Sequence, residues 1–225
     1  MNVEAIKPFN SRWQHPCNIV VAGPSKSGKT RFIRKMIRHR TWKFDPPIKY
    51  VVYLYSIWQD EYDNMKKEFG DEVKWVKGLP DDPYALFKRT PGLLIADDLM
   101  GEMESDHRQI AKWFTKGTHH MDVSLAVLMQ NVFPAHMRTA SLNAHRIVLF
   151  RNPRDKSQLQ ALARQAFPGQ AKWLNRALEE ANKRPFRPLI MDFDQSTPDE
   201  YRLSLDPFPE DLKDSNKPFP QVILP

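Results

Sequence analysis

The chain has 225 residues, of which 41% are apolar and 27% charged, as expected for a globular protein built around one α/β domain. Cys17 is the only cysteine, which excludes an intrachain disulfide and favours a reducing compartment. The longest apolar runs, 51–55 and 125–129, are too short to span a bilayer, and residues 1–13 lack the apolar stretch of a secretory signal. We therefore expect an intracellular, soluble protein with no membrane partner.

The net charge of +7 is distributed unevenly along the chain. Residues 1–56 carry +9, residues 57–110 carry −6, residues 111–191 carry +9 and residues 192–225 carry −5. Two basic blocks in a protein with a pI of about 9.4 favour a polyanionic partner such as nucleic acid. An ATP site also requires local positive charge, so charge alone leaves both interpretations open.

Short β-branched and aromatic runs alternate with helical patterns along the chain, which is typical of a doubly wound parallel sheet. Strands are predicted at 17–22, 50–56, 93–97, 124–130, 146–151 and 189–193, with a weaker one near 73–77. An amphipathic helix is predicted after residue 30, and a helical pair at 155–166 and 170–183. The expected fold is α/β, with a mostly parallel central sheet flanked by helices on both faces.

The composition and periodicity of the sequence change near residue 195. Prolines are scattered among acidic residues with no helical or alternating period, at Pro198, Pro207, Pro209, Pro218, Pro220 and Pro225. We therefore divide the chain into a domain of residues 1–194 and a Pro-rich, acidic tail of residues 195–225. The tail is expected to be poorly structured or to form an extended arm on a neighbour.

A phosphate-binding loop is predicted between the first strand and the helix that follows it. The segment Gly23, Pro24, Ser25, Lys26, Ser27, Gly28, Lys29, Thr30 matches G-x-x-x-x-G-K-[ST] in full. The glycines let the backbone N–H groups turn toward phosphate oxygens, and the helix N-terminus adds a partial positive charge. Lys29 is expected at the β- and γ-phosphates of ATP and the Thr30 hydroxyl at Mg²⁺. A chance match within a turn is disfavoured by the flanking strand and helix.

Polar residues follow two other predicted strands. Asp97 and Asp98 end the run that begins at Leu93, and carboxylates there lie at the ligand-binding edge of such a sheet. Asp97 is predicted beside Mg²⁺, and Asp98 is predicted to polarise the attacking water. Alternatively, Asp98 only caps the next helix. Gln130 leaves a later strand and is predicted to sense the γ-phosphate, the alternative being an ordinary polar strand end.

The adjacent pair His119 and His120, with Asp122 close by, raises the question of a metal site. Neighbouring side chains of an extended segment point to opposite faces, so the two imidazoles cannot easily share one ion. We therefore disfavour zinc and expect the pair to position the strand that carries Gln130.

Several segments resemble one known family. They are residues 114–120 (FTKGTHH), 130–134 (QNVFP), 138–145 (RTASLNAH), 150–155 (FRNPRD) and 198–202 (PDEYR). These segments are similar to the genome-packaging ATPases of Maverick/Polinton elements and their adintovirus relatives. That family belongs to the FtsK–HerA superfamily, which includes the poxvirus-type packaging ATPases. The resemblance runs from about Asn18 to Phe208.

The resemblance implies a P-loop NTPase of the ASCE, RecA-like type that hydrolyses ATP with Mg²⁺. It also implies a homo-oligomeric ring, often a hexamer, that moves double-stranded DNA into a preformed viral capsid. The capsid or its portal vertex would then be a partner, and the protein would act in an infected host cell or be associated with the virion. Carried over, the resemblance gives Lys29 and Thr30 the phosphate and Mg²⁺ contacts, Asp97 and Asp98 the acidic pair, and Gln130 the sensor.

An arginine finger from a neighbouring subunit is also expected from the resemblance, with three candidates. Arg154 follows Pro153 in the first turn of a predicted helix, where the dipole disfavours a cation unless a phosphate offsets it. It could equally point into solvent or pair with an acid. Arg138 lies in one of the resembling segments, and Lys116 stands where relatives often carry arginine. Lysine can neutralise charge there but lacks the bidentate fork.

Other functions compete with a packaging motor. A DNA helicase or segregation translocase of the same superfamily would share the ATP site. A P-loop nucleotide or small-molecule kinase is disfavoured because the chain lacks an arginine-rich lid and carries the Gln130 sensor. An ATP-binding scaffold is disfavoured by the pair Asp97 and Asp98. Stimulation of ATP hydrolysis by DNA would separate the motor from the kinase.

Overall fold

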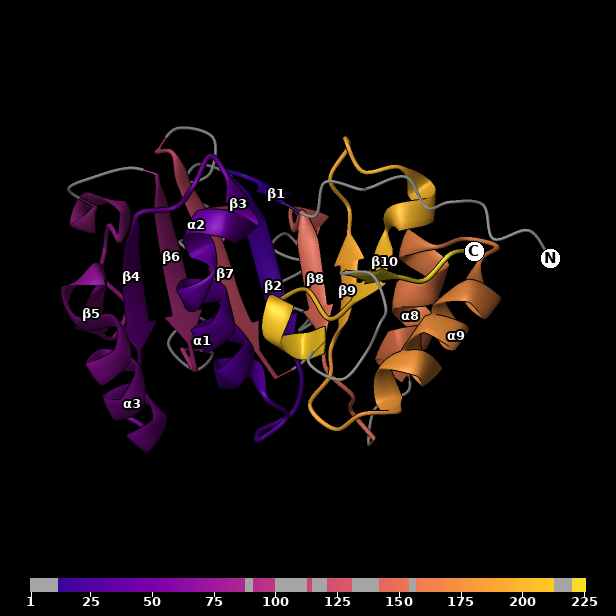
Figure 1. The fold of residues 1–225 in the computed structure, drawn as a ribbon, viewed down its shortest axis with the longest axis horizontal. Coiled ribbons are helices and arrows are strands. Elements are labelled where there is room, and N and C mark those ends of the chain that lie inside the picture. The colour runs from indigo at the N-terminus through magenta and orange to yellow at the C-terminus, as the bar shows by residue number, and fades with distance from the viewer. Residues whose placement is uncertain are drawn as a thin grey trace.

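The computed structural model describes residues 12–87, 91–99, 113–114, 121–130, 142–153, 157–212 and 220–225. Nine strands within these ranges form one sheet in the order β11-β10-β9-β8-β2-β7-β6-β4-β5 (Figure 1). They are β2 (Asn18–Ala22), β4 (Tyr50–Tyr55), β5 (Val73–Lys77), β6 (Gly92–Asp97), β7 (Val123–Met129), β8 (Arg146–Leu149), β9 (Leu189–Asp192), β10 (Leu203–Leu205) and β11 (Gln221–Val222). A separate small sheet pairs β1 (Trp13–Gln14) with β3 (Phe44–Asp45).

The predicted strands are confirmed, each with ends within two residues of those expected. Their direction corrects the sequence-based expectation, because the sheet is mixed rather than mostly parallel. Strands β8, β2, β7, β6, β4 and β5 are parallel, whereas β9, β10 and β11 extend the sheet with antiparallel pairings. The sequence misses this because β9 is buried along its whole length, as the parallel strands are, and burial does not encode direction.

Helices cover both faces of the sheet, which confirms an α/β fold. The α-helices are α1 (Lys29–Arg38), α2 (Arg40–Lys43), α3 (Asp60–Phe69), α8 (Ser157–Ala166) and α9 (Ala171–Asn182). Apolar residues of α1 and α3 pack on one face, and residues of α8 and α9 pack on the other. Figure 1 shows α1 in front of the sheet, joined by a loop to the end of β2. The described helices include none long and apolar enough to cross a membrane.

Successive side chains of β2 point alternately into the two hydrophobic cores. Val20 and Ala22 face the core under α8 and α9, whereas Ile19 and Val21 face the core under α1 and α3. All four are buried, so the strand has no solvent face. Burial on both sides fixes the register of β2, since a slip of one residue would exchange the sets of side chains that fill the two cores. The fixed register of β2 therefore also fixes the position at which the loop after Ala22 begins.

The described part of the expected tail packs against the domain, which corrects the expectation of poor structure there. Strands β10 and β11 extend the main sheet, and Phe208 is fully buried in the core under α1. Asp206 is buried as well and accepts a hydrogen bond of 2.8 Å from Arg187, which precedes β9. The two strands escape detection in the sequence because three and two residues are too few to show a period.

Candidate functional site

The loop 23–28 joins the carboxyl end of β2 to helix α1. The Gly23 N–H donates to the Met129 carbonyl at 3.1 Å, which fixes the start of the loop against the end of β7. A side chain at Gly23 would clash, because its Cβ would lie 2.6 Å from Phe150 Cβ and 2.8 Å from Ser27 Oγ. Gly28, with φ of 108°, adopts a conformation that side chains rarely tolerate. Both glycines of the predicted motif are thus required by the local geometry.

Lys29 turns back over this loop from the first residue of α1. Its Nζ donates to the carbonyls of Gly23 and Pro24 at 2.6 and 3.0 Å, so the ammonium lies inside the curve of the loop. Burial lowers the pKa of Lys29, and the charges of Asp97 and Asp98 oppose that shift. The structure therefore brings the predicted lysine and the predicted acids to one place.

Asp97 ends β6 on the face of the sheet that α1 and α3 cover. Two buried tyrosines donate to its Oδ2, Tyr53 of β4 at 2.5 Å and Tyr62 of α3 at 2.9 Å. Burial raises the pKa of Asp97, and these two hydrogen bonds act against the rise. Burial and the Asp97 charge raise the pKa values of both tyrosines, so each hydroxyl stays protonated and remains a donor. The carboxylate is thereby fixed in one orientation.

Asp98 and Gln130 differ from Asp97 in being exposed. Asp98 has φ of 56°, an unusual conformation for a residue with a side chain, and such conformations concentrate at functional sites. Gln130 follows β7, whose last residue, Met129, pairs with Ala22 of β2. Both residues therefore leave the sheet at the edge from which the 23–28 loop also leaves.

The remaining predicted residues lie outside the described part of the chain. These are the three finger candidates and the histidine pair, at Lys116, Arg138, Arg154, His119 and His120. Their roles stay predictions. Within the described ranges, no group of three or more His, Cys, Asp or Glu side chains could hold a metal ion.

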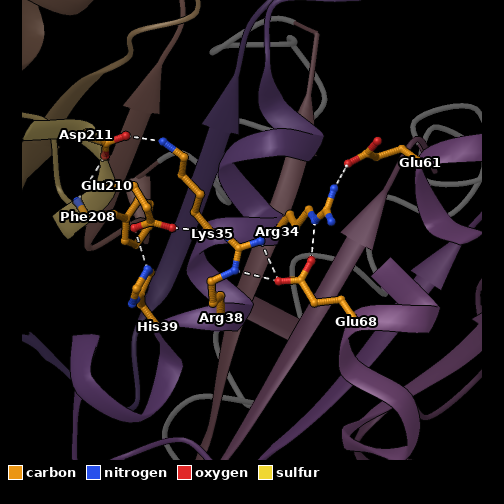
Figure 2. Close-up of polar contacts among 9 residues, drawn as sticks. All are labelled: Arg34, Lys35, Arg38, His39, Glu61, Glu68, Phe208, Glu210 and Asp211. Atoms are coloured by element: carbon orange, nitrogen blue, oxygen red, sulfur yellow. Dashed lines mark hydrogen bonds and ion pairs between the residues drawn. The ribbon is translucent and has the colours of Figure 1, made fainter. Parts of the chain in front are cut away.

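Helix α1 is tied to α3 by ion pairs on its exposed side (Figure 2). Arg34 donates to Glu61 at 2.8 Å and to Glu68 at 2.6 Å. Arg38 donates to the same Glu68 at 2.6 Å. Because the pairs are partly exposed, each contributes little by itself, but together they hold α1 against a neighbouring element.

A second group of ion pairs ties α1 to the C-terminal 3₁₀ helix η6 (Pro209–Leu212) (Figure 2). Lys35 pairs with Asp211, while Arg38 donates to Glu210 at 3.0 Å. His39 shares a hydrogen bond of 2.5 Å with Glu210. The acidic residues that the sequence assigned to a tail therefore hold the helix that follows the 23–28 loop.

The residues at this loop fit a phosphate group. Ser27 Oγ is buried and has no hydrogen-bond partner among the described residues. In that same part of the chain, the start of α1 has no side-chain cap and no acidic residue in its first turn. A helix start of this kind attracts anions through its N–H groups and its dipole. Thr30 and Asp97 are the residues that would hold a Mg²⁺ ion, and water and phosphate would supply its other ligands.

Three aromatic residues at the site were not predicted from the sequence. Tyr53 and Tyr62 orient Asp97, and Phe150 packs beside Gly23. Tyr53 gives one weak signal, since its hydroxyl on a strand predicted to be buried requires a partner. Nothing in the sequence identifies that partner as Asp97.

Comparison with known proteins gives no assignment. No model of a known protein family matches the chain, and a search of curated proteins finds no significant match.

Proposed function

We propose that this protein is an ATP-hydrolysing motor that moves double-stranded DNA, and that it packages a viral genome into a capsid. The observation that carries the ATPase part is the convergence of the 23–28 loop, the Lys29 ammonium and the pair Asp97 and Asp98 at one sheet edge. The DNA part is supported by the net charge of +7 and by the family resemblance.

In this proposal each residue has a separate task. Backbone N–H groups of the loop and the Lys29 ammonium bind the phosphates, and the Thr30 hydroxyl and the Asp97 carboxylate hold Mg²⁺. When bound, Mg²⁺ would supply positive charge that offsets the negative charge of the phosphates. The Asp98 carboxylate orients a water molecule and accepts its proton, while the Gln130 amide orients the same water or the γ-phosphate. Tyr53 and Tyr62 position Asp97.

Substitution of Lys29 tests the phosphate site. Lys29→Ala should lower ATP turnover by about 10²–10³-fold, because it removes the cation that stabilises charge on the transferred group. Lys67→Ala is the matched control, since it removes an equal charge from an exposed position on α3. Near-normal turnover by a folded Lys29→Ala protein would refute the nucleotide site.

Substitutions of Asp97 and Asp98 should have different effects. Asp98→Asn should keep ATP binding and lose about 10²–10⁴-fold in turnover, because the amide cannot accept a proton. Asp97→Asn should weaken the Mg²⁺-dependent part of binding. If Asp98→Asn hydrolyses ATP at the wild-type rate, another group activates the water.

DNA binding distinguishes a motor from a kinase. Binding to a duplex should be independent of sequence and fall with salt, with a log–log slope of about −0.9 for each phosphate contacted. Duplex DNA should also stimulate ATP hydrolysis. Absence of both effects in a folded oligomer at low salt would remove the motor proposal, and release of single strands would indicate a helicase instead.

A ring requires that neighbouring subunits share the reaction. Lys29→Ala mixed with an inactive Arg138→Ala or Arg154→Ala protein should recover part of the activity, because some interfaces then join an intact loop to an intact finger. Lys116→Ala is the third variant to test. A fluorescence control for subunit exchange is needed, since recovery cannot occur without mixed rings. Full activity of every finger variant would exclude all three candidates.

A further inference from the structure

A cavity of about 200 Å³ lies directly beside the start of α1. Its walls come from three parts of the chain: Gly28 and Arg31 of the loop and helix, Pro185 and Phe186 before β9, and Pro207 of the C-terminal segment. Sites that enclose a whole drug-sized ligand usually measure roughly 300–1,000 Å³, so this cavity is suited to one part of a nucleotide. Most of the lining residues are charged, and Phe186 and three prolines supply an apolar part of the wall.

The cavity lies on the opposite side of the loop from the two acids. In the sheet order, β6 with Asp97 is two strands from β2 in one direction, and β9 is two strands from β2 in the other. Leu149 of β8 pairs with both Ala22 and Leu189, so the segment before β9 reaches the same sheet edge as the 23–28 loop. A nucleotide with its terminal phosphate toward Asp97 would extend its other end toward this cavity.

Phe186 is the residue that gives the cavity a specific chemistry. The residue is 58% exposed, and its φ of 60° is an unusual conformation for an aromatic residue. It lies against the loop, because a Cβ built on Gly28 would be 3.2 Å from Phe186 Cβ. Conformations of this kind are retained where the surrounding structure requires them, often in ligand sites. An exposed ring next to a phosphate-binding loop is suited to stack with a nucleobase.

We propose that this cavity binds the nucleoside part of the nucleotide, with the base stacked on Phe186. The proposal rests on the ATP site proposed above and names the residues that would hold the end of the ligand away from the reaction. It assigns a binding role to the C-terminal segment 206–211, which closes one side of the cavity.

Three polar residues of the cavity wall, Arg187, Glu210 and Asp211, are already engaged in hydrogen bonds or ion pairs. Arg187 donates to Asp206 at 2.8 Å, to the Glu180 carbonyl at 3.2 Å and to Gln221 at 2.9 Å. Glu210 and Asp211 are held by the ion pairs of α1 (Figure 2). These contacts hold the wall in place, so the groups that make them do not form hydrogen bonds with the edge of a base. Stacking accepts any base, so ATP and GTP should bind with affinities within about tenfold of each other.

The test compares nucleotides with inorganic tripolyphosphate, which has the phosphates but no nucleoside. Calorimetry with Mg²⁺ and the full chain should show that Phe186→Ala weakens ATP and GTP binding by roughly tenfold to a hundredfold. Affinity for tripolyphosphate should not change. Phe186→Trp should restore nucleotide binding, because it keeps an aromatic face. Ile57→Ala, at another exposed apolar residue, is the control and should leave all three affinities unchanged.

Three outcomes would overturn the inference. Phe186→Ala could bind ATP with wild-type affinity, it could lose ATP and tripolyphosphate equally, or the wild type could prefer ATP to GTP by much more than tenfold. All three leave the proposed ATPase intact provided that Lys29→Ala weakens binding of both ligands. Failure of the wild-type chain to bind either ATP or tripolyphosphate would refute the phosphate site and, with it, this inference.

Discussion

Replacement of Tyr62 by phenylalanine tests how the acidic site is held. The change removes one hydroxyl that donates to Asp97 Oδ2 at 2.9 Å and keeps the ring in its aromatic contacts with Tyr53 and Trp75. A hydrogen bond to a charged group contributes roughly 1.5–3 kcal/mol, against about 0.5–1.5 kcal/mol for a neutral pair. Tyr84→Phe is the matched control, because its hydroxyl donates at 3.0 Å to the neutral Trp113 carbonyl.

The effect should depend on pH with a definite sign. Burial raises the pKa of Asp97, so the folded protein holds that proton more tightly than the unfolded chain does. The contribution of Asp97 to stability therefore falls as pH rises from the ordinary carboxyl range through the raised folded pKa. Tyr62→Phe removes a bond that favours the charged form, which raises the folded pKa further and makes the total fall in stability larger. Above the folded pKa of Asp97, the free energy lost in Tyr62→Phe should approach that of a hydrogen bond to a charged group. Below that pKa it should approach that of a hydrogen bond between neutral groups.

Urea denaturation without nucleotide measures both quantities by linear extrapolation. In a pH series that starts in the ordinary carboxyl range, the costs of Tyr62→Phe and Tyr84→Phe should be similar at its acid end, and Tyr62→Phe should cost more free energy of unfolding as pH rises through the raised pKa of Asp97. The slope of free energy against urea should match the wild type, since neither change alters the surface exposed on unfolding. Equal costs for the two variants throughout the pH series would refute the assignment of Tyr62 as a donor to a charged Asp97.

Two further predictions concern the walls of the site. Gly28→Ala should lower the free energy of unfolding by more than about 1 kcal/mol and weaken ATP binding. The alanine would have to keep a φ of 108°, and its Cβ would lie 3.3 Å from Phe150 Cε1. Gly169→Ala, also at positive φ but with nothing within 4 Å, should leave ATP binding unchanged, so equal binding losses would contradict the contact argument. Arg187→Met should cost about 3–5 kcal/mol by leaving Asp206 buried without its cation. The two partly exposed pairs lost in Arg34→Met should cost about 0–1 kcal/mol each, and a similar cost for Arg34→Met and Arg187→Met in urea melts would refute a buried ion pair at Arg187.

The sequence by itself determined the local elements and one candidate site. The apolar runs that became β2, β4, β6, β7 and β8 are readable because burial on both faces requires apolar residues in unbroken order. The glycine pattern before Lys29 is readable because few residues other than glycine tolerate such a backbone conformation. Asp97, Asp98 and Gln130 could be placed at one edge because parallel strands end together.

Only the tertiary structure decided which distant residues meet. Tyr53 and Tyr62 are 44 and 35 positions from Asp97, and no local pattern records that pairing. Segment 206–211 has the composition of a flexible tail, yet it folds against α1 because Phe208 is buried and its acidic residues pair with cations that its own sequence does not contain. The periodicity of apolar residues indicates which faces of a helix or strand are buried. Pairing partners and strand direction depend instead on the path of the whole chain.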